Sequence, residues 1–200
     1  MTVLLDLIRH GETVTPGCLI GRCDPALSNR GREQFAGQVI GRSWDELIAS
    51  PRLRTRMSAE ALAIERHMPL RIDDDWRELD FGDWDGRPLA ELQADQAAAD
   101  AVAAFYRDPD APGAPGGESW RGLESRVVRA FDRLLAPPAP RSALVVTHGG
   151  PMRAALAITC ALPFANLWTF RIEPGTRITL RIGRDKCASI WGEIVEVVQP

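Results

Sequence analysis

The sequence predicts an α/β fold with three layers, α/β/α, in which helices cover both faces of a mixed, mainly parallel sheet. Segments of strand and helix character alternate through the first 160 residues, as in parallel sheets. After them, alternating apolar segments separated by Pro174-Gly175 and Gly183 predict antiparallel edge strands near the C-terminus. The 200 residues, 45% of them apolar, suffice for one domain over residues 1–200.

Three strands and two helices are expected in the first half of the chain. Short runs rich in leucine and β-branched residues predict strands over residues 3–8, 47–50 and 70–72. Ser28 has a side chain that suits a helix N-cap, so a helix is expected over residues 29–42. A second helix is expected over residues 53–67. Its apolar positions form one stripe, made of Leu53, Met57, Ala61 and Ile64.

The second half is expected to begin with a helix over residues 89–102, with Pro88 at its first position. Ser119 should cap another helix over residues 120–135. A strand over residues 143–147 then leads through His148-Gly149-Gly150-Pro151 into a helix that ends at Cys160. The expected final strands cover residues 168–172, 177–182 and 189–197. Residues 108–117 and 136–140 are interpreted as surface loops.

Charge and composition exclude several classes of partner. With 24 basic and 27 acidic residues, the net charge of −3 offers no general attraction to nucleic acid or to an anionic membrane. The apolar run 1–8 carries Asp6 and lacks a basic region before it, and residues 154–165 are too few to span a membrane. A cytoplasmic protein is therefore expected. The four cysteines are expected as free thiols, and three histidines are too few for a zinc site, since two of them are candidates for another role.

Two of the three histidines occupy matching places in the sequence. His10 follows the first strand and Arg9, and His148 follows a later strand; a glycine comes directly after each. Open α/β sheets bind ligands at the carboxyl ends of their strands. Gly149 also opens a helix whose free N–H groups favour an anion. A strand-end histidine held only by backbone is the ordinary alternative for either residue, but the matching pair favours a functional site.

Two further segments carry candidate groups. Arg54 lies in the first turn of a helix, where a cation opposes the helix dipole unless an anion binds; a solvated surface arginine is the alternative. Residues 77–86 form an acid-rich loop with aromatic side chains, which could hold one carboxylate in an apolar setting. Composition does not say which acid that is. His67 ends a helix, where its charge is favourable without any function.

Four short blocks follow one another along the chain: Arg9-His10-Gly11-Glu12, Ser50-Pro51-x-x-Arg54, Glu78-x-x-Phe81-Gly82-x-Trp84-x-Gly86 and Thr147-His148-Gly149-Gly150. Together they resemble the histidine phosphatase superfamily, which has the phosphoglycerate-mutase-like fold. Two finer segments look most like the alpha-ribazole phosphatases of cobalamin assembly: Pro16-Gly17-Cys18-x-x-Gly21-Arg22-x-Asp24-x-x-Leu27 and Leu167-Trp168-x-Phe170-Arg171-Ile172.

The resemblance implies a metal-independent phosphomonoesterase that needs no cofactor and acts on a small-molecule phosphate monoester. His10 would attack phosphorus and become phosphohistidine. Arg9, Arg54 and His148, with the amide of Gly149, would bind the phosphoryl oxygens together with His10, and Glu78 would be the general acid. The two arginines should lower the pKa of His10 by like-charge repulsion. A monomer and a homodimer both stay open.

Departures from the family pattern separate the alternatives. Pro16 stands where an Asn is common, so one phosphate contact is in doubt. Phosphoglycerate mutases carry an Arg directly after the catalytic Glu, where this chain has Leu79, and a Lys where it has Leu89. With Ile20, these residues predict a pocket for a bulky, weakly charged leaving group. A mutase, a broad-specificity phosphatase and a catalytically silent binding module are the alternatives. Glu12 and Glu118 stay ambiguous, and Glu118 is left outside the catalytic set.

Overall fold

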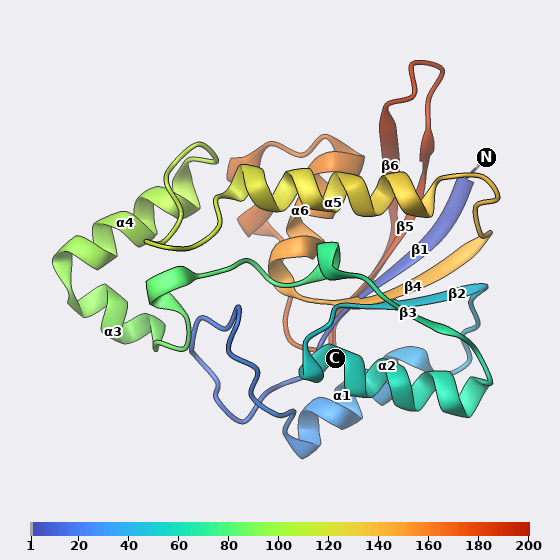
Figure 1. The fold of residues 1–200 in the computed structure, drawn as a ribbon, viewed down its shortest axis with the longest axis horizontal. Helices are drawn as coiled ribbons and strands as arrows, with labels where there is room; N and C mark the ends of the chain where they lie inside the picture. The colour runs from blue at the N-terminus through green and yellow to red at the C-terminus, as the bar shows by residue number, and fades with distance from the viewer. Residues whose placement is uncertain (1) are drawn as a thin grey trace.

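A computed structural model describes residues 2–200, so Met1, the first residue of the apolar run 1–8, lies outside the described residues. The centre of the fold is a six-stranded sheet in the order β3-β2-β4-β1-β5-β6 (Figure 1). Its strands are β1 (Thr2–Arg9), β2 (Glu46–Ala49), β3 (Leu70–Ile72), β4 (Ser142–Thr147), β5 (Arg177–Arg184) and β6 (Ile190–Val198). The first four are parallel, whereas β5 and β6 are antiparallel to their neighbours. The predicted mixed sheet with antiparallel edge strands is confirmed.

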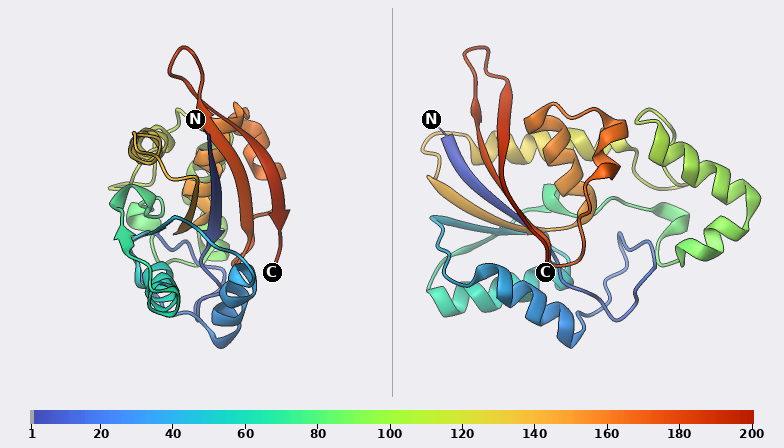
Figure 2. Two further views of the ribbon diagram at one scale, coloured as in Figure 1. Left: turned by 90° about the vertical axis from the view of Figure 1, so that its right-hand side faces the viewer. Right: turned by 180° about the vertical axis from the view of Figure 1, so that it is seen from behind.

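Helices cover both faces of this sheet, which gives the predicted three layers (Figure 2). On one face lie α1 (Asn29–Val39) and α2 (Leu53–Arg66), packed over alternate residues of the central strands. On the other face, α5 (Trp120–Leu134) and α6 (Gly149–Cys160) enclose a larger core. The central strands β1 and β4 are buried on both faces over most of their length, which explains why their sequences are mainly apolar.

The pairing of β1 with β4 determines where the two candidate histidines emerge. These strands run parallel, with Arg9 opposite Thr147, and the amide of His10 donates to the carbonyl of Thr147 at 2.9 Å. The segments that follow the two strands therefore leave the sheet at its carboxyl end and at the same level. His10 and His148 are brought together by this register.

The expected helix over residues 89–102 is wrong as a single element. It is divided into α3 (Leu89–Ala94) and α4 (Gln96–Arg107), because Asp95 accepts from the amide of Ala98 and begins a new helix. Pro88 is the N-cap of α3 and not its first helical residue. The two helices form a lobe at one end of the molecule, coloured light green in Figure 1.

The expected strand over residues 168–172 is also wrong. Residues Phe164–Thr169 form a 3-10 helix, η3, and its aromatic side chains pack against α4 and α5. Trp168 lies edge-on to Tyr106, with ring centroids 4.7 Å apart. Aromatic residues favour strands in general, but here tertiary packing decides the local structure.

Two predictions for the helices on the lower face in Figure 1 need correction. The helix that follows Ser28 ends at Val39 and does not reach residue 42. In α2 the predicted stripe lies toward solvent, since Leu53, Met57 and Ile64 are 44%, 58% and 75% exposed. The buried positions of α2 include the smaller residues Ala59 and Ala63, which allow the helix to approach the sheet closely.

Within residues 2–200, no helix is both long and apolar enough to cross a membrane. No group of three or more histidine, cysteine or acidic side chains in the described part of the chain is arranged to hold a metal ion.

Candidate active site

His10 and His148 lie side by side at the carboxyl ends of β1 and β4. Their ring centroids are 5.2 Å apart and the rings are inclined by 65°. Nδ1 of His10 is 2.8 Å from the carbonyl oxygen of Gly11, which only accepts hydrogen bonds. We therefore assign the proton of the neutral ring to Nδ1. That assignment leaves a free lone pair on Nε2, the atom that a nucleophilic imidazole needs.

His148 is fully buried, and its two ring nitrogens are in different environments. Nε2 lies 2.7 Å from the hydroxyl of Ser50, which follows β2, whereas the buried Nδ1 has no partner. Burial is the main cause that lowers the pKa of both histidines well below the ordinary value, and Arg9 and Arg54 lower it further. The predicted repulsion from the arginines is present, but it is second to burial. Both rings are therefore neutral near pH 7.

Arg9 and Arg54 each have one buried nitrogen without a partner. Arg9 donates through Nη1 to the carbonyl of Ile172 at 2.7 Å, and its Nε is unpaired. The Nη atoms of Arg54 donate to the carbonyls of residues 20, 21 and 23 and to Asp24, whose Oδ1 is 3.2 Å away. Its Nε is also unpaired. Leaving a buried donor unpaired costs about 1–3 kcal/mol, which a bound acceptor would recover.

Glu78 reaches the start of α6 from the loop after β3. Glu78 is 8% exposed, and its carboxylate accepts from the amide of Gly150 at 3.0 Å and from the amide of Leu79 at 2.9 Å. Gly150 has no room for a side chain here, since a Cβ atom would lie 2.3 Å from Oε1 of Glu78. The N-terminus of α6 thus fixes the position of the Glu78 carboxylate.

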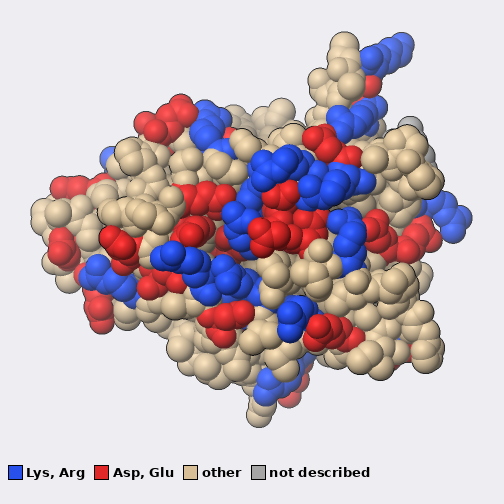
Figure 3. All heavy atoms as spheres, viewed as in Figure 1, with Lys and Arg blue, Asp and Glu red and all other residues tan. Residues whose placement is uncertain are grey.

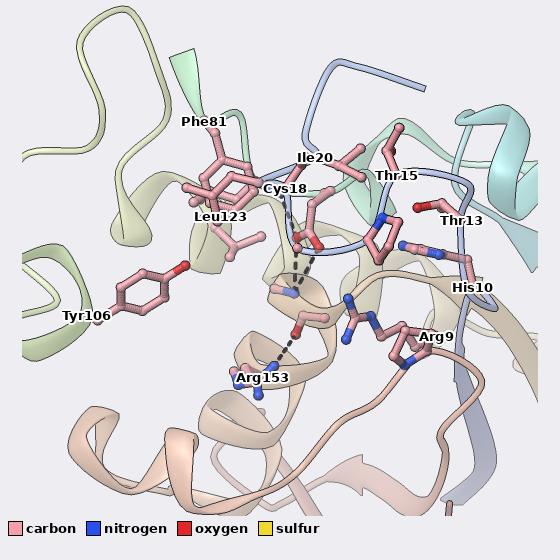
Figure 4. Close-up of a pocket in the computed structure, with 18 of the residues that line it drawn as sticks. Arg9, His10, Thr13, Thr15, Cys18, Ile20, Phe81, Tyr106, Leu123 and Arg153 are labelled. Atoms are coloured by element: carbon pink, nitrogen blue, oxygen red, sulfur yellow. Dashed lines mark hydrogen bonds between the residues drawn. The ribbon is translucent and has the colours of Figure 1, made fainter. Parts of the chain in front are cut away.

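A cavity of about 410 Å³ opens beside these groups. Arg9, His10, Glu78 and Gly149 line its inner end, whereas Arg54 and His148 are not among its lining residues. Apolar and aromatic side chains make much of the outer wall, including Leu19, Ile20, Leu79, Phe81, Trp120 and Leu123 (Figure 4). The predicted places of Ile20 and Leu79 are confirmed. Leu89 is not a lining residue and packs against the core.

Sequence reasoning missed two polar residues of the outer wall. Tyr106 lies across the cavity from His10, with its hydroxyl toward the interior (Figure 4), and burial raises its pKa to about 12. Arg153, from α6, stacks over Trp168 at 4.9 Å and makes only long hydrogen bonds, of 3.4 and 3.3 Å, to the carbonyls of Gly149 and Phe170. Its Nε is buried and unpaired, and burial lowers its pKa. The outer wall is therefore more polar than expected.

Glu12 and Pro16 also line the cavity. Glu12 accepts from the hydroxyl of Ser28, the N-cap of α1, at 2.9 Å, and its amide donates to Gln34. Glu12 therefore ties the loop after β1 to α1.

Comparisons with known proteins match the chain to one family model and to several phosphatases. The family model of the histidine phosphatase superfamily (branch 1) matches residues 5–191. The adenosylcobalamin/alpha-ribazole phosphatase of Escherichia coli K12 is 30% identical over 174 residues, covering 84% of this chain and 85% of that protein. A glucosyl-3-phosphoglycerate phosphatase of Mycolicibacterium vanbaalenii is 35% identical over 175 residues, covering 81% and 76%.

Solved structures show the same fold. The alpha-ribazole phosphatase of Shigella flexneri superposes with a TM-score of 0.80 at 26% identity and covers 100% of this chain and 96% of that one. A mycobacterial glucosyl-3-phosphoglycerate phosphatase gives a TM-score of 0.80 at 27% identity and covers 96% of both chains.

Proposed function

The chain belongs to the histidine phosphatase superfamily and is a phosphoric monoester hydrolase, and we propose that it acts through a phosphohistidine formed on His10. In the first step the Nε2 lone pair of His10 attacks phosphorus, so that the N–P bond forms while the bond to the leaving oxygen breaks. Glu78 gives its proton to that oxygen, and the alcohol departs. In the second step water attacks phosphorus, Glu78 takes the proton of that water, and His10 is released with inorganic phosphate.

One observation carries this proposal. The unpaired buried atoms Nε of Arg9, Nε of Arg54 and Nδ1 of His148 belong to residues that surround His10. Donors of this kind suit a phosphoryl group, whose oxygens carry negative charge throughout the transfer. Gly149 adds the N-terminus of α6 on the same side. Because these groups supply the neutralising charge, the proposed reaction needs no metal ion.

We propose alpha-ribazole 5′-phosphate as the substrate. The names of the relatives and the aromatic and apolar outer wall support an alcohol that carries a ring system. A second candidate is a phosphate ester whose alcohol bears a carboxylate, as in the relatives that act on glucosyl-3-phosphoglycerate. The specific observation behind it is Arg153, a guanidinium in the cavity wall without an acidic partner within residues 2–200. A mutase is disfavoured by Leu79, which stands where mutases hold the substrate carboxylate.

The first experiment tests the intermediate. Enzyme mixed with a radiolabelled phosphate ester and quenched should carry phosphate that is labile to acid and stable to base. His10→Ala should lose both this label and turnover, and activity should persist in EDTA. A labelled His10→Ala protein, or loss of activity in EDTA, would contradict the proposal.

The second experiment tests the substrate by comparing kcat/KM for alpha-ribazole 5′-phosphate, glucosyl-3-phosphoglycerate and p-nitrophenyl phosphate. We expect the first ester to be best. Arg153→Met is the matched variant: it should lower kcat/KM selectively for glucosyl-3-phosphoglycerate if that acid-bearing ester is the substrate. A preference for that ester, lost in Arg153→Met, would replace the first candidate by the second.

A further inference from the structure

An ion pair between a buried arginine and a glutamate that is 14% exposed lies behind the Glu78 loop and outside the cavity. Arg126, in the middle of α5, is 1% exposed, and its guanidinium meets the carboxylate of Glu118 with distances of 2.8 Å from Nε and 2.9 Å from Nη2. Neither residue lines the cavity. The proposed reaction gives neither a role.

Arg126 uses all five of its N–H groups. Besides the two bonds to Glu118, Nη1 donates to the carbonyls of Asp75 and Arg77 at 2.8 and 2.6 Å, and Nη2 donates to the carbonyl of Glu78 at 3.1 Å. A guanidinium carries five donors in a fixed planar fork, whereas an ammonium has three. One side chain therefore determines the path of the backbone up to and including the general acid.

Glu118 fixes the same loop on the other side of Glu78. Its amide donates to the carbonyl of Asp80 at 2.8 Å, and its carboxylate accepts weakly from the amide of Asp80 at 3.4 Å. Gly117 packs so closely that a Cβ atom there would lie 2.6 Å from the Asp80 carbonyl oxygen. The backbone is thus held both at Glu78 and two residues after it.

This arrangement fixes both ends of the Glu78 side chain. Arg126 holds the main-chain carbonyl, and the amide of Gly150 holds the carboxylate at 3.0 Å. A general acid loses efficiency quickly when its proton is displaced from the leaving oxygen, since proton transfer needs hydrogen-bond distance.

We propose that Arg126 and Glu118 are positioning residues that act through Glu78, an inference that rests on the proposed role of Glu78 as general acid. They keep its carboxyl group where the leaving oxygen forms. Arg126 and Glu118 affect the step in which the leaving oxygen is protonated, and they do not affect phosphate binding. The importance of the pair must therefore depend on how strongly the leaving group needs a proton.

A double-mutant cycle on two substrates tests this inference. Arg126→Lys keeps the charge but loses the fork, and we expect it to lower kcat/KM for an alkyl phosphate at least about tenfold. On p-nitrophenyl phosphate, whose leaving group is stable without a proton, the loss should stay below about threefold. In a Glu78→Gln background, Arg126→Lys should cause no further loss on the alkyl ester, because residues that act as a unit are not additive.

The control is Arg133→Lys. Basic and acidic side chains gather on the surface over α5 (Figure 3). Arg133 lies on this helix and pairs with Asp73 and Asp75, but its side chain is 44% exposed and makes no hydrogen bond to Glu78. Arg133→Lys should change kcat/KM by less than about twofold on both substrates, because ion pairs at the surface contribute little free energy. Circular dichroism and Tm verify that each variant is folded. If Arg126→Lys does not fold, the same cycle is measured with Glu118→Gln in its place.

Two results would overturn the inference. Equal losses on the two substrates with additive energies in the cycle would make the pair structural, and so would failure of both variants to fold. Failure of the proposed function has a different signature. In that case the wild-type protein lacks the phosphohistidine or His10→Ala remains active, whatever the cycle shows.

Discussion

The hydroxyl of Ser50 assigns a chemical state to His148 that mutation can test. Ser50 is fully buried, its Oγ accepts a long hydrogen bond of 3.4 Å from the amide of Arg52, and it lies 2.7 Å from Nε2 of His148. Within residues 2–200, Nε2 is the one hydrogen-bond partner of this hydroxyl that can accept, so we assign the hydroxyl as the donor and place the ring proton on Nδ1. That atom is the unpaired donor beside His10. Ser50 therefore makes His148 a hydrogen-bond donor, as its role toward the phosphoryl group in the proposed reaction requires.

Ser50→Ala leaves Nε2 buried without a partner, at a cost of about 1–3 kcal/mol. If the ring responds by changing tautomer or orientation, the donor to phosphate is lost and kcat/KM falls about 5- to 150-fold. The loss should be equal on alkyl and aryl esters, because the proposed contact of His148 is to the phosphoryl group and not to the alcohol. In a chain of this length, Tm should fall by about 2–4 °C for each kcal/mol by which the substitution lowers the free energy of unfolding.

The assay compares kcat/KM on both esters and the affinity for orthovanadate as a phosphate analogue. Ser125→Ala is the matched control, since Ser125 is exposed on α5 and its hydroxyl donates only to the carbonyl of Arg121. We expect the control to change neither quantity beyond about twofold, as is usual for surface substitutions. Unchanged kcat/KM and vanadate affinity in folded Ser50→Ala would refute the assignment of the His148 proton.

Three further predictions follow from the same geometry. Glu78→Gln should lower kcat/KM about 10²- to 10⁴-fold on an alkyl phosphate and clearly less on p-nitrophenyl phosphate; equal losses would show that Glu78 does not donate the proton. Arg9→Lys should cost more than about tenfold, or 1.4 kcal/mol, and a smaller loss in kcat/KM would make Arg9 peripheral. His10 and His148 have lowered pKa values in the folded state, so the unfolded chain binds more protons and the free energy of unfolding should fall as pH drops below about 6.5. Denaturant titrations at several pH values should show a slope smaller by up to about 1.4 kcal/mol per pH unit in His148→Gln, and an unchanged slope would contradict this origin.

Local patterns predicted most elements of the fold because strong signals agreed with the packing. The N-caps Ser28 and Ser119 accept from Gly31 and Gly122 as expected, and the buried strands of the sheet follow the apolar runs. The errors arose where distant contacts decide. In the sequence, Asp95 is only a weak N-cap signal, and the break between α3 and α4 becomes clear only in the folded lobe. Trp168 lies in a 3-10 helix because aromatic rings of α4 and α5 surround it.

The site was predictable to the extent that it depends on strand order. Parallel strands end at one edge, so two strand-end histidines could be expected together before any contact was known. Arg126 and Arg153 left no such signal, because an arginine inside an amphipathic helix looks like one that faces water. What distinguishes them is the set of acceptors that the fold brings to each. Arg126 finds five hydrogen bonds and no free donor, so it fixes the structure, whereas Arg153 keeps a buried donor unpaired beside the cavity. By that criterion the first supports the proposed general acid, and the second is available to a ligand in the cavity.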